Sequence, residues 1–465
     1  GEAVFSIISL FLRDYAPIRE RAEAATERML AIPELLRQGS ANLKRAPRAW
    51  VEKGINECTG AIALLTEGVD ILFERHGVND PAFFSAARVA REGFRIFKHD
   101  LQERLLATAH DHYACGAEAF DMLLRTGHCL EMDGAAVEAY ARARLEEARR
   151  NLAAMAEQIE PGTPAEQLLA RLQDDHPAQP DYYPAFQAEF DAARTYAIER
   201  ELLTWPDYPI VFEPIPDWAR AAQPYLYFLF YRAPAPFDPH VVQRYLMTPV
   251  EPDMPAEEQM RRLRATNRSQ IRLNHIIHHG GIGHHVQNWW AYRAESRIAR
   301  VAAVDCALRI AMLCGGTMAE GWACYAVDLM GEQGYFTPLE ALSEQQSLAR
   351  MAARAVVDCG LHRGTLSFDA AVAFYRDEAS MPEQAARTEV IKNSMFPGAA
   401  MMYLIGTDAI HTLRRDLQDR WGAEFSLRRF HDAFLAHGSL PVALVAKLMQ
   451  GEPITLDGYV PPLSG

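Results

Sequence analysis

The stretch "ATNRSQIRLNHIIHHGGIGHHVQNWW", residues 265–290, predicts two helices separated by a glycine-rich break. The apolar spacing favours a helix over 266–279, and a helical pattern resumes at 284. Glycines occupy positions 280, 281 and 283, and each costs about 1 kcal/mol relative to alanine inside a helix. The sequence therefore predicts a kink with histidines on both sides of it.

Helical patterns also dominate the rest of the chain. Long amphipathic segments start at Asp80 and Asp133, whose side chains can cap the free amides of a helix N-terminus. Two segments, 208–218 and 225–236, are instead rich in β-branched and aromatic residues and bounded by prolines, which is typical of edge strands. We therefore expect a mainly α fold with one small β-sheet. It would form a helical lobe over 1–205 and a second lobe over 206–465, or one continuous domain.

Composition places the chain among ordinary globular proteins. Apolar residues make up 49% and charged residues 23%, and the net charge of −14 argues against a nucleic-acid partner, which needs a basic face. Seven cysteines without a C-x-x-C pair indicate reduced thiols. No secretory signal is recognisable, and the apolar run at 225–231 is shorter than the about 20 residues that span a bilayer. We expect a soluble cytoplasmic protein without a membrane partner, and a homodimer remains open.

Five histidines lie within eleven residues around the predicted kink: His275, His278, His279, His284 and His285. Helices that meet at a kink can direct imidazoles from both sides toward one point, as a metal site requires. On one continuous helix, His275 and His279 would share a face instead, because they are spaced i, i+4. The alternative is that some of these histidines cap helices or form hydrogen bonds in the core.

A metal ion also needs a counter-charge, and the stretch "GGTMAEGWACYAVDLM", residues 315–330, offers one. Glu320 falls in the first turns of a predicted helix, and the neighbouring Trp322 and Tyr325 indicate that this helix is packed inside the protein. A buried carboxylate requires a cation or hydrogen bonds. The alternative is an exposed glutamate that stabilises the helix N-terminus.

These motifs resemble those of a large bacterial gluzincin-like family, distantly similar to the thermostable metallocarboxypeptidases. Its signature is H-E-x-x-P-G-H-H-x-Q, then E-G-W-A-x-Y, then P-G-Q-A-x-x-Y-x-x-G. This chain has "HHGGIGHHVQ" at 278–287, "EGWACY" at 320–325 and "PGAAMMYLIG" at 397–406. The resemblance covers most of the chain, and it implies a large two-lobed, metallopeptidase-like fold with the small sheet beside a deep cleft.

The resemblance also implies roles for individual residues. His278, His284 and Glu320 would bind a divalent metal ion, which we expect to be zinc, with iron or manganese as alternatives because imidazole accepts several metals. His285 would act in catalysis and Gln287 would bind substrate in the same pocket. The substrate would be a small molecule or a short peptide.

Four positions depart from the family pattern, and one of them bears on the chemistry. Tyr403 is retained and would stabilise a developing oxyanion. His279 replaces the glutamate that serves as general base, Ile282 and Ala399 replace the proline and glutamine of the motifs, and Leu404 occupies a position where the family commonly has lysine. An imidazole with a pKa near 6.5 can still accept a proton from metal-activated water. His279 would therefore be the catalytic base, or a further metal ligand.

Two residues of the predicted second strand complete the candidate site. In gluzincin-like folds an edge strand holds extended substrate above the metal helix, so Arg232 could bind a carboxylate and Tyr227 could line the pocket. The alternatives are a solvated arginine and a core tyrosine.

The leading hypothesis is a metal-dependent hydrolase of a small amide-, ester- or peptide-like metabolite. The first alternative is non-hydrolytic chemistry, an oxidation, rearrangement or cyclisation at iron or another transition metal. The second is a pseudoenzyme that binds a ligand without turnover. The absence of the family glutamate favours the alternatives, whereas the retained ligand set favours the two enzymatic hypotheses.

Overall fold

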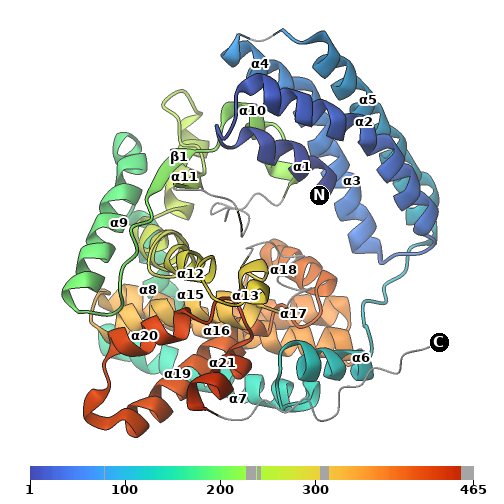
Figure 1. Ribbon diagram of the computed structural model, residues 1–465. Helices are drawn as coiled ribbons and strands as arrows, with labels where there is room; N and C mark the ends of the chain where they lie inside the picture. Colours follow the sequence, from blue (N-terminus) through green and yellow to red (C-terminus); the bar gives the residue numbers. More distant parts are fainter. Residues whose placement is uncertain (78, 227–236, 238–241, 304–313, 452–465) are drawn as a thin grey trace. The chain divides into compact units, whose positions relative to one another are not determined.

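The computed structural model describes residues 1–77, 79–226, 237, 242–303 and 314–451. Helices account for most of them, and the one sheet within these ranges has two strands, so the predicted mainly α fold is confirmed. The chain divides into two compact units (Figure 1). Unit 1 comprises residues 1–113, 214–230 and 246–249, and unit 2 comprises residues 114–213, 231–245 and 250–465. This division differs from the predicted boundary at 205, because the helices from 114 onward pack with the C-terminal half.

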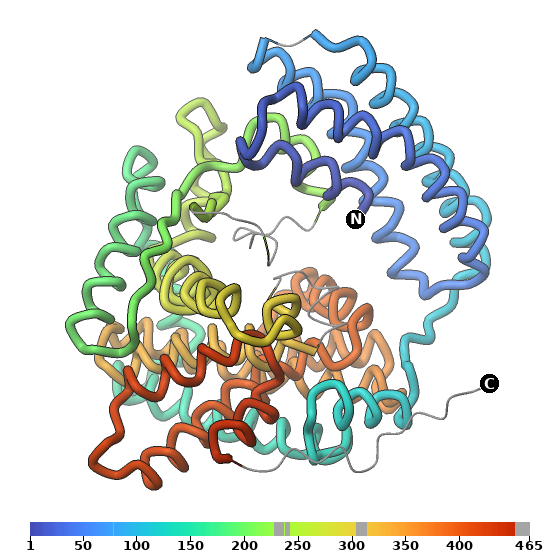
Figure 2. Tube along the Cα trace, viewed as in Figure 1, coloured from blue at the N-terminus to red at the C-terminus, as the bar shows by residue number. Residues whose placement is uncertain are grey.

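Unit 1 is a helical array around a hydrophobic core of mostly aliphatic side chains, with a group of phenylalanines among them. Its helices are α1 (Glu2–Phe11), α2 (Ile18–Asn42), α3 (Arg48–Ala63), α4 (Val69–His76), α5 (Pro81–Asp100) and the short α10 (Asp217–Arg220). Figure 2 shows α2 and α5 side by side, both in blue. The predicted cap of α5 is confirmed, because the Asp80 side chain accepts hydrogen bonds from the amides of Ala82 and Phe83.

Unit 2 contains the remaining described helices. Those that precede the sheet are α6 (Ala117–Met122), α7 (Gly134–Ile159), α8 (Ala165–Arg171) and α9 (Tyr182–Glu199). After it come α11 (Ala256–Ala265), the π-helix η8 (Gln270–Gly280), α12 (His284–Ala291), α13 (Arg297–Val301), α15 (Gly316–Glu332), α16 (Pro338–Arg363), α17 (Phe368–Ala379), α18 (Glu383–Met395), α19 (Met402–Trp421), α20 (Leu427–Leu435) and α21 (Val442–Gln450).

Two helix pairs organise this unit, although each pair is far apart in sequence. Helix α7 lies along α16, and α15 lies along α19. Local sequence fixes where these helices start: Asp133 caps α7 as predicted, and Thr337 forms a capping box with Glu340 at the start of α16. Helix α16 is terminated by Gly364, the residue after its last one, which takes the left-handed conformation that favours glycine.

The small sheet is only partly where the sequence predicted it. The first strand, β1 (Ile210–Pro214), falls inside the predicted segment 208–218. Its partner is β2 (Gln243–Met247), and backbone hydrogen bonds from Gln243 to Pro209 and from Ile215 to Met247 make the two strands parallel. The predicted second strand, 225–236, begins at the end of a 3₁₀ turn (Gln223–Tyr225), and residues 227–236 lie outside the described part of the chain.

Candidate metal centre

The glycine-rich break is a tight backbone contact between two helical segments. The π-helix η8 ends at Gly280, and α12 begins at His284. A Cβ atom at Gly283 would lie 2.0 Å from the carbonyl oxygen of His278, so no larger residue fits there without moving the backbone. This close approach brings the histidines on the two sides of the break together. π-Helical turns are rare and frequently mark functional sites.

Three imidazoles converge at the break. Each of His278, His279 and His284 offers a ring nitrogen, and these nitrogens lie within 4.8 Å of one another. The ring centroid of His278 is 4.5 Å from that of His279 and 4.9 Å from that of His284. Two of the rings come from η8 and one from α12, so the cluster depends on the kink between the two segments.

Glu320 of α15 completes the cluster. Its Oε2 lies 3.4 Å from Nε2 of His278 and 3.5 Å from Nε2 of His284. Ligands bound tetrahedrally to an ion at about 2.0–2.1 Å are separated by about 3.3 Å, so Oε2 of Glu320 lies at ligand-to-ligand distance from each of the two imidazole nitrogens. Glu320 is 8% exposed, and its Oε2 makes no hydrogen bond within the described residues. A buried, unsatisfied carboxylate oxygen beside two imidazoles fits a cation.

The electrostatics of the cluster favour a charged Glu320 carboxylate and a neutral His279 imidazole. Burial raises the pKa of the Glu320 carboxyl, but the imidazoles of His278 and His284 outweigh burial and hold that pKa well below its usual value of 4.5. Burial lowers the pKa of His278, and burial together with the two neighbouring imidazoles holds the pKa of His279 well below 6.5. The carboxylate is therefore charged and the imidazole of His279 is neutral at pH 7, which are the forms that bind a metal ion.

Neighbouring groups orient two of the imidazoles. Nδ1 of His279 lies 2.7 Å from the carbonyl oxygen of Asn274, so it carries the proton and donates, which leaves Nε2 as the free lone pair. Nδ1 of His278 lies 3.9 Å from Sγ of Cys324. The indole of Trp322 donates to the carbonyl oxygen of Ile282 within the break, at 2.9 Å, so the helix that carries Glu320 also supports the kink.

Helix α15 is positioned by an unusually close approach to α19. A Cβ atom at Gly406 would lie 2.2 Å from the carbonyl oxygen of Thr317, and one at Gly321 would lie 2.7 Å from Gly406. Because Gly321 directly follows Glu320, the two helix backbones touch next to the carboxylate. The motif "PGAAMMYLIG", residues 397–406, thus contributes its last glycine to the position of the site.

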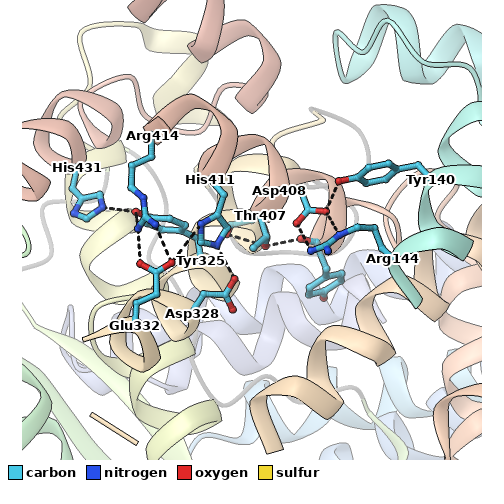
Figure 3. Close-up of polar contacts among 12 residues, drawn as sticks. Tyr140, Arg144, Tyr325, Asp328, Glu332, Thr407, Asp408, His411, Arg414 and His431 are labelled. Atoms are coloured by element: carbon cyan, nitrogen blue, oxygen red, sulfur yellow. Dashed lines mark hydrogen bonds and ion pairs between the residues drawn. The ribbon is translucent and has the colours of Figure 1, made fainter. Parts of the chain in front are cut away.

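Farther along α15, polar pairs fix its other end to α19. Figure 3 shows Asp328 beside His411 and Glu332 beside Arg414. Nε2 of His411 lies 2.8 Å from Oδ2 of Asp328, and Arg414 makes a bidentate ion pair with Glu332 at 2.8 and 2.9 Å. These bonds are at ordinary hydrogen-bonding distance, in contrast to the longer distances around Glu320.

Two histidines of the same stretch lie in other hydrogen-bond networks. Nε2 of His285 is 2.7 Å from the carbonyl oxygen of Tyr208, and its ring stacks on the Tyr208 ring with centroids 4.6 Å apart. Nδ1 of His275 lies 2.6 Å from the hydroxyl of Tyr245. Burial lowers the pKa of each to about 4. The structure therefore places His285 outside the imidazole group, and it separates His275 from His279, its i+4 neighbour.

The predicted substrate residues have varied positions. Gln287 is buried and donates a hydrogen bond to the Ser439 hydroxyl at 2.7 Å. The ring of Tyr403 lies against the guanidinium of Arg354, whose Cζ is 4.8 Å from the ring centroid. Tyr227 and Arg232 lie outside the described residues.

Sequence reasoning missed two neighbours of the site. Arg354 of α16 is held by Glu389 at 2.8 Å, and its charge acts on His278. Cys324 was visible in the sequence only as the i+4 neighbour of Glu320. No local pattern marks Arg354, because its sequence distance from the histidines is large.

Residues 2–449 match the family described as "Bacterial protein of unknown function (DUF885)", and the chain belongs to this family. No curated protein matches the sequence. These comparisons support the bacterial family assignment, but they provide no evidence for similarity to gluzincins or carboxypeptidases.

Two solved structures resemble the chain over nearly its whole length. One, from Shewanella oneidensis, has a TM-score of 0.73 and 20% identity, and the match covers 96% of this chain and 81% of that one. The other, from Colwellia psychrerythraea, has a TM-score of 0.72 and 16% identity, with 93% and 76% covered. At such identities the similarity shows a shared fold.

The expected cytoplasmic location is corrected by these two structures. Each is described as a "putative lipoprotein", and neither description supports a cytoplasmic location. The cysteine pattern on which the expectation depended reports the redox state of thiols and does not by itself fix a compartment. Separately, no helix within the described ranges has the length and apolar character needed to cross a bilayer.

Proposed function

We propose that this member of the DUF885 family is a metal-dependent enzyme that hydrolyses an amide, ester or peptide-like bond in a small molecule or short peptide. One observation carries the proposal: Oε2 of Glu320 lies at ligand-to-ligand distance from Nε2 of His278 and from Nε2 of His284, and it has no hydrogen-bond partner within the described residues. The order of the motifs, which resembles that of gluzincin-like peptidases, supports the hydrolytic assignment.

The ion that fits this donor set is a divalent transition metal. Two imidazoles and one carboxylate are the protein ligands of many catalytic zinc sites, which leave a position for water or substrate. A bound ion would polarise a substrate carbonyl and lower the pKa of water. The protein would supply a charged Glu320, a neutral His279 imidazole and a buried environment that strengthens electrostatic interactions.

His279 would take the place of the missing acidic base. Its Nδ1 proton is committed to Asn274, so Nε2 is the atom that could accept a proton or bind the ion. The low pKa of His279 makes its imidazole a weak base before a metal binds. Tyr403, held under Arg354, would donate to a developing oxyanion once substrate is bound.

Iron-dependent, non-hydrolytic chemistry is the second candidate. It is favoured by the third imidazole, because a set of three histidines and one carboxylate suits iron as well as zinc. Manganese is a further alternative. A ligand-binding protein without turnover is the third candidate, favoured by the absence of an acidic residue at position 279.

Metal analysis of the purified protein tests the site itself. Glu320→Gln and His284→Ala should reduce bound metal from near stoichiometric to trace amounts, because each removes a ligand. Glu332→Gln is the matched control, since it changes a carboxylate on the same helix that is paired with Arg414. Equal metal content in all three variants would show that the cluster is structural.

Reloading the metal-free protein distinguishes the reactions. Stripped protein is supplied with zinc or ferrous iron and assayed on small amides, esters and dipeptides, with and without oxygen. Cleavage with zinc in the absence of oxygen supports hydrolysis. Product formation that requires both iron and oxygen supports the second candidate and excludes the first.

A further inference from the structure

A second candidate site lies in unit 2, in a cavity of about 890 Å³. Helices α8, α11 and α16 carry most of its lining (Figure 1), and Ser269 contributes where η8 begins. None of His278, His279, His284 and Glu320 lines this cavity. Its walls combine apolar side chains, such as Leu169 and Met260, with amides and hydroxyls.

Three arginines line the cavity, and they differ in their partners. Arg261 pairs with Glu258 at 2.7 Å, and Arg264 pairs with Asp174 at 2.9 Å. Arg350 makes no ion pair or hydrogen bond within the described residues, and its Nε is buried without a partner. One cation of the lining is therefore uncompensated.

Other partly buried arginines in the described part of this unit have carboxylate partners. Four other partly buried arginines each pair with a carboxylate at 2.8–3.0 Å, namely Arg144, Arg272, Arg354 and Arg363. A guanidinium that loses water without gaining an anion is destabilised. Burial and the nearby charge of Arg354 lower the pKa of Arg350, which is the sign of a cation without a counter-ion.

A second unsatisfied group lies on the same cavity. Ser269 is 3% exposed, and its hydroxyl has no hydrogen-bond partner within the described residues. A small shift of this side chain would let the hydroxyl donate to a bound oxygen. The structure thus holds a free guanidinium and a free hydroxyl at one cavity.

We propose that this cavity binds a small organic anion, with a carboxylate of the ligand paired to the guanidinium of Arg350. A planar guanidinium matches a carboxylate with two parallel hydrogen bonds. The apolar wall receives the carbon skeleton of the ligand. A phosphate is the poorer fit, because it has no carbon skeleton to contact the apolar wall formed by Leu169 and Met260. The proposal does not depend on the metal centre.

The test uses the full-length protein and three probes: glutarate, citrate and inorganic phosphate, each compared with sodium chloride at equal ionic strength. Calorimetry and thermal unfolding report binding. We expect glutarate or citrate to bind at about millimolar affinity, the range of one good ion pair in an open cavity. Binding by neither, or by phosphate alone, overturns the proposal.

Substitutions locate the binding. Arg350→Met should weaken carboxylate binding at least about 10-fold, because it removes a charge-assisted pair. Arg261→Met is the control on the same cavity and should change binding by less than about 3-fold, because that arginine is exposed and already paired. Equal binding by Arg350→Met and the wild type overturns the proposal.

Stability separates a ligand-binding arginine from a structural one. Without added anion, Arg350→Met should unfold at the same temperature as the wild type or a higher one, because no internal partner is lost, and its metal content should be unchanged. Arg354→Met should unfold at a lower temperature, because Glu389 loses its partner. A loss of stability in Arg350→Met would show a structural role and overturn the proposal.

A variant that adds an internal partner for Arg350 keeps the test decisive if Arg350→Met does not fold. Ser347→Glu places a carboxylate one helical turn before Arg350, on the same cavity. The new carboxylate should occupy the guanidinium, raise the unfolding temperature and weaken glutarate or citrate binding at least about 10-fold. Unchanged binding in this variant contradicts the assignment to Arg350.

Discussion

Helix α15 carries the carboxylates of two histidine–carboxylate groups, and these groups are built differently. At one end, Oε2 of Glu320 lies 3.4 and 3.5 Å from two imidazole nitrogens and makes no hydrogen bond within the described residues. Two turns later, Asp328 and His411 meet at 2.8 Å (Figure 3). The second group is a satisfied pair that holds two helices together. The first leaves room for an ion between its atoms.

The difference shows that residue type alone does not identify a metal site. Both groups combine imidazole with carboxylate. They differ in whether the carboxylate and the imidazole form a hydrogen bond with each other. Orphaned atoms at ligand-to-ligand distances indicate a missing cation, whereas atoms at hydrogen-bonding distance do not.

The largest expected effect separates the two carboxylates by metal affinity. Glu320→Gln should weaken metal binding at least about 10³-fold, because even a partner outside the ligand shell is worth about 10–100-fold. Asp328→Asn should retain stoichiometric metal while the protein unfolds more readily. Competition with a chelator of known affinity measures both. An equal loss of metal affinity in the two variants would contradict the assignment of metal binding to Glu320 alone of the two carboxylates.

The next effect concerns the third imidazole. His279→Ala should lower hydrolytic turnover by about 10²–10⁴, the range for loss of a general base. If His279 is instead a ligand, the same variant loses metal in parallel with activity. His279→Glu restores the residue of the gluzincin-like motif and should keep or raise activity toward simple peptides. An unchanged rate in the alanine variant would assign the base to another group.

A backbone change tests whether the kink assembles the first group. Gly283→Ala should destabilise the protein by about 3 kcal/mol or more and release the metal, because its Cβ would collide with the His278 carbonyl. Gly39→Ala is a control at a position with open space around the Cβ and without a positive φ. Chemical denaturation measures both. A Gly283→Ala protein that is stable and metal-bound would show that the close contact is unnecessary.

The last effect is a pH dependence beside the second group, where the Glu344 carboxyl interacts with Asp328. Burial, and then the charge of Asp328, raise the pKa of Glu344 from 4.5 to about 9. Since the folded state then binds more protons than the unfolded state, the contribution of Glu344 is fully present below pH 4.5 and is lost as the pH rises toward 9. The free energy of unfolding then falls by at most about 1.4 kcal/mol per pH unit because of this group.

Glu344→Gln removes that titration. Stability of the variant should fall less steeply between pH 5 and pH 9 than that of the wild type, as measured by denaturant unfolding at several pH values. The metal content at pH 7 should be unchanged, because Glu344 lies beside the satisfied group. If the free energy of unfolding fell equally steeply with pH in both proteins, the raised pKa of Glu344 would be contradicted.

Local chemistry in the sequence determined the helical class, the starts of α5 and α7 at aspartate caps, and the break at the three glycines. Each depends on residues a few positions apart, which the sequence shows directly. The sequence also singled out His278, His284 and Glu320 as one group, through spacing and motif resemblance. The structure brings these three side chains together.

Tertiary structure decided the rest, because it depends on contacts between distant segments. His279 and His285 are each the second residue of a His-His pair. Asn274 nevertheless accepts a hydrogen bond from His279, which lies in the cluster, whereas His285 contacts the carbonyl oxygen of Tyr208 outside it. The division of the chain at 113 rather than 205 reflects packing of α7 along α16. The unpaired guanidinium of Arg350 is likewise invisible in sequence, because only the folded chain shows which carboxylates reach an arginine and which do not.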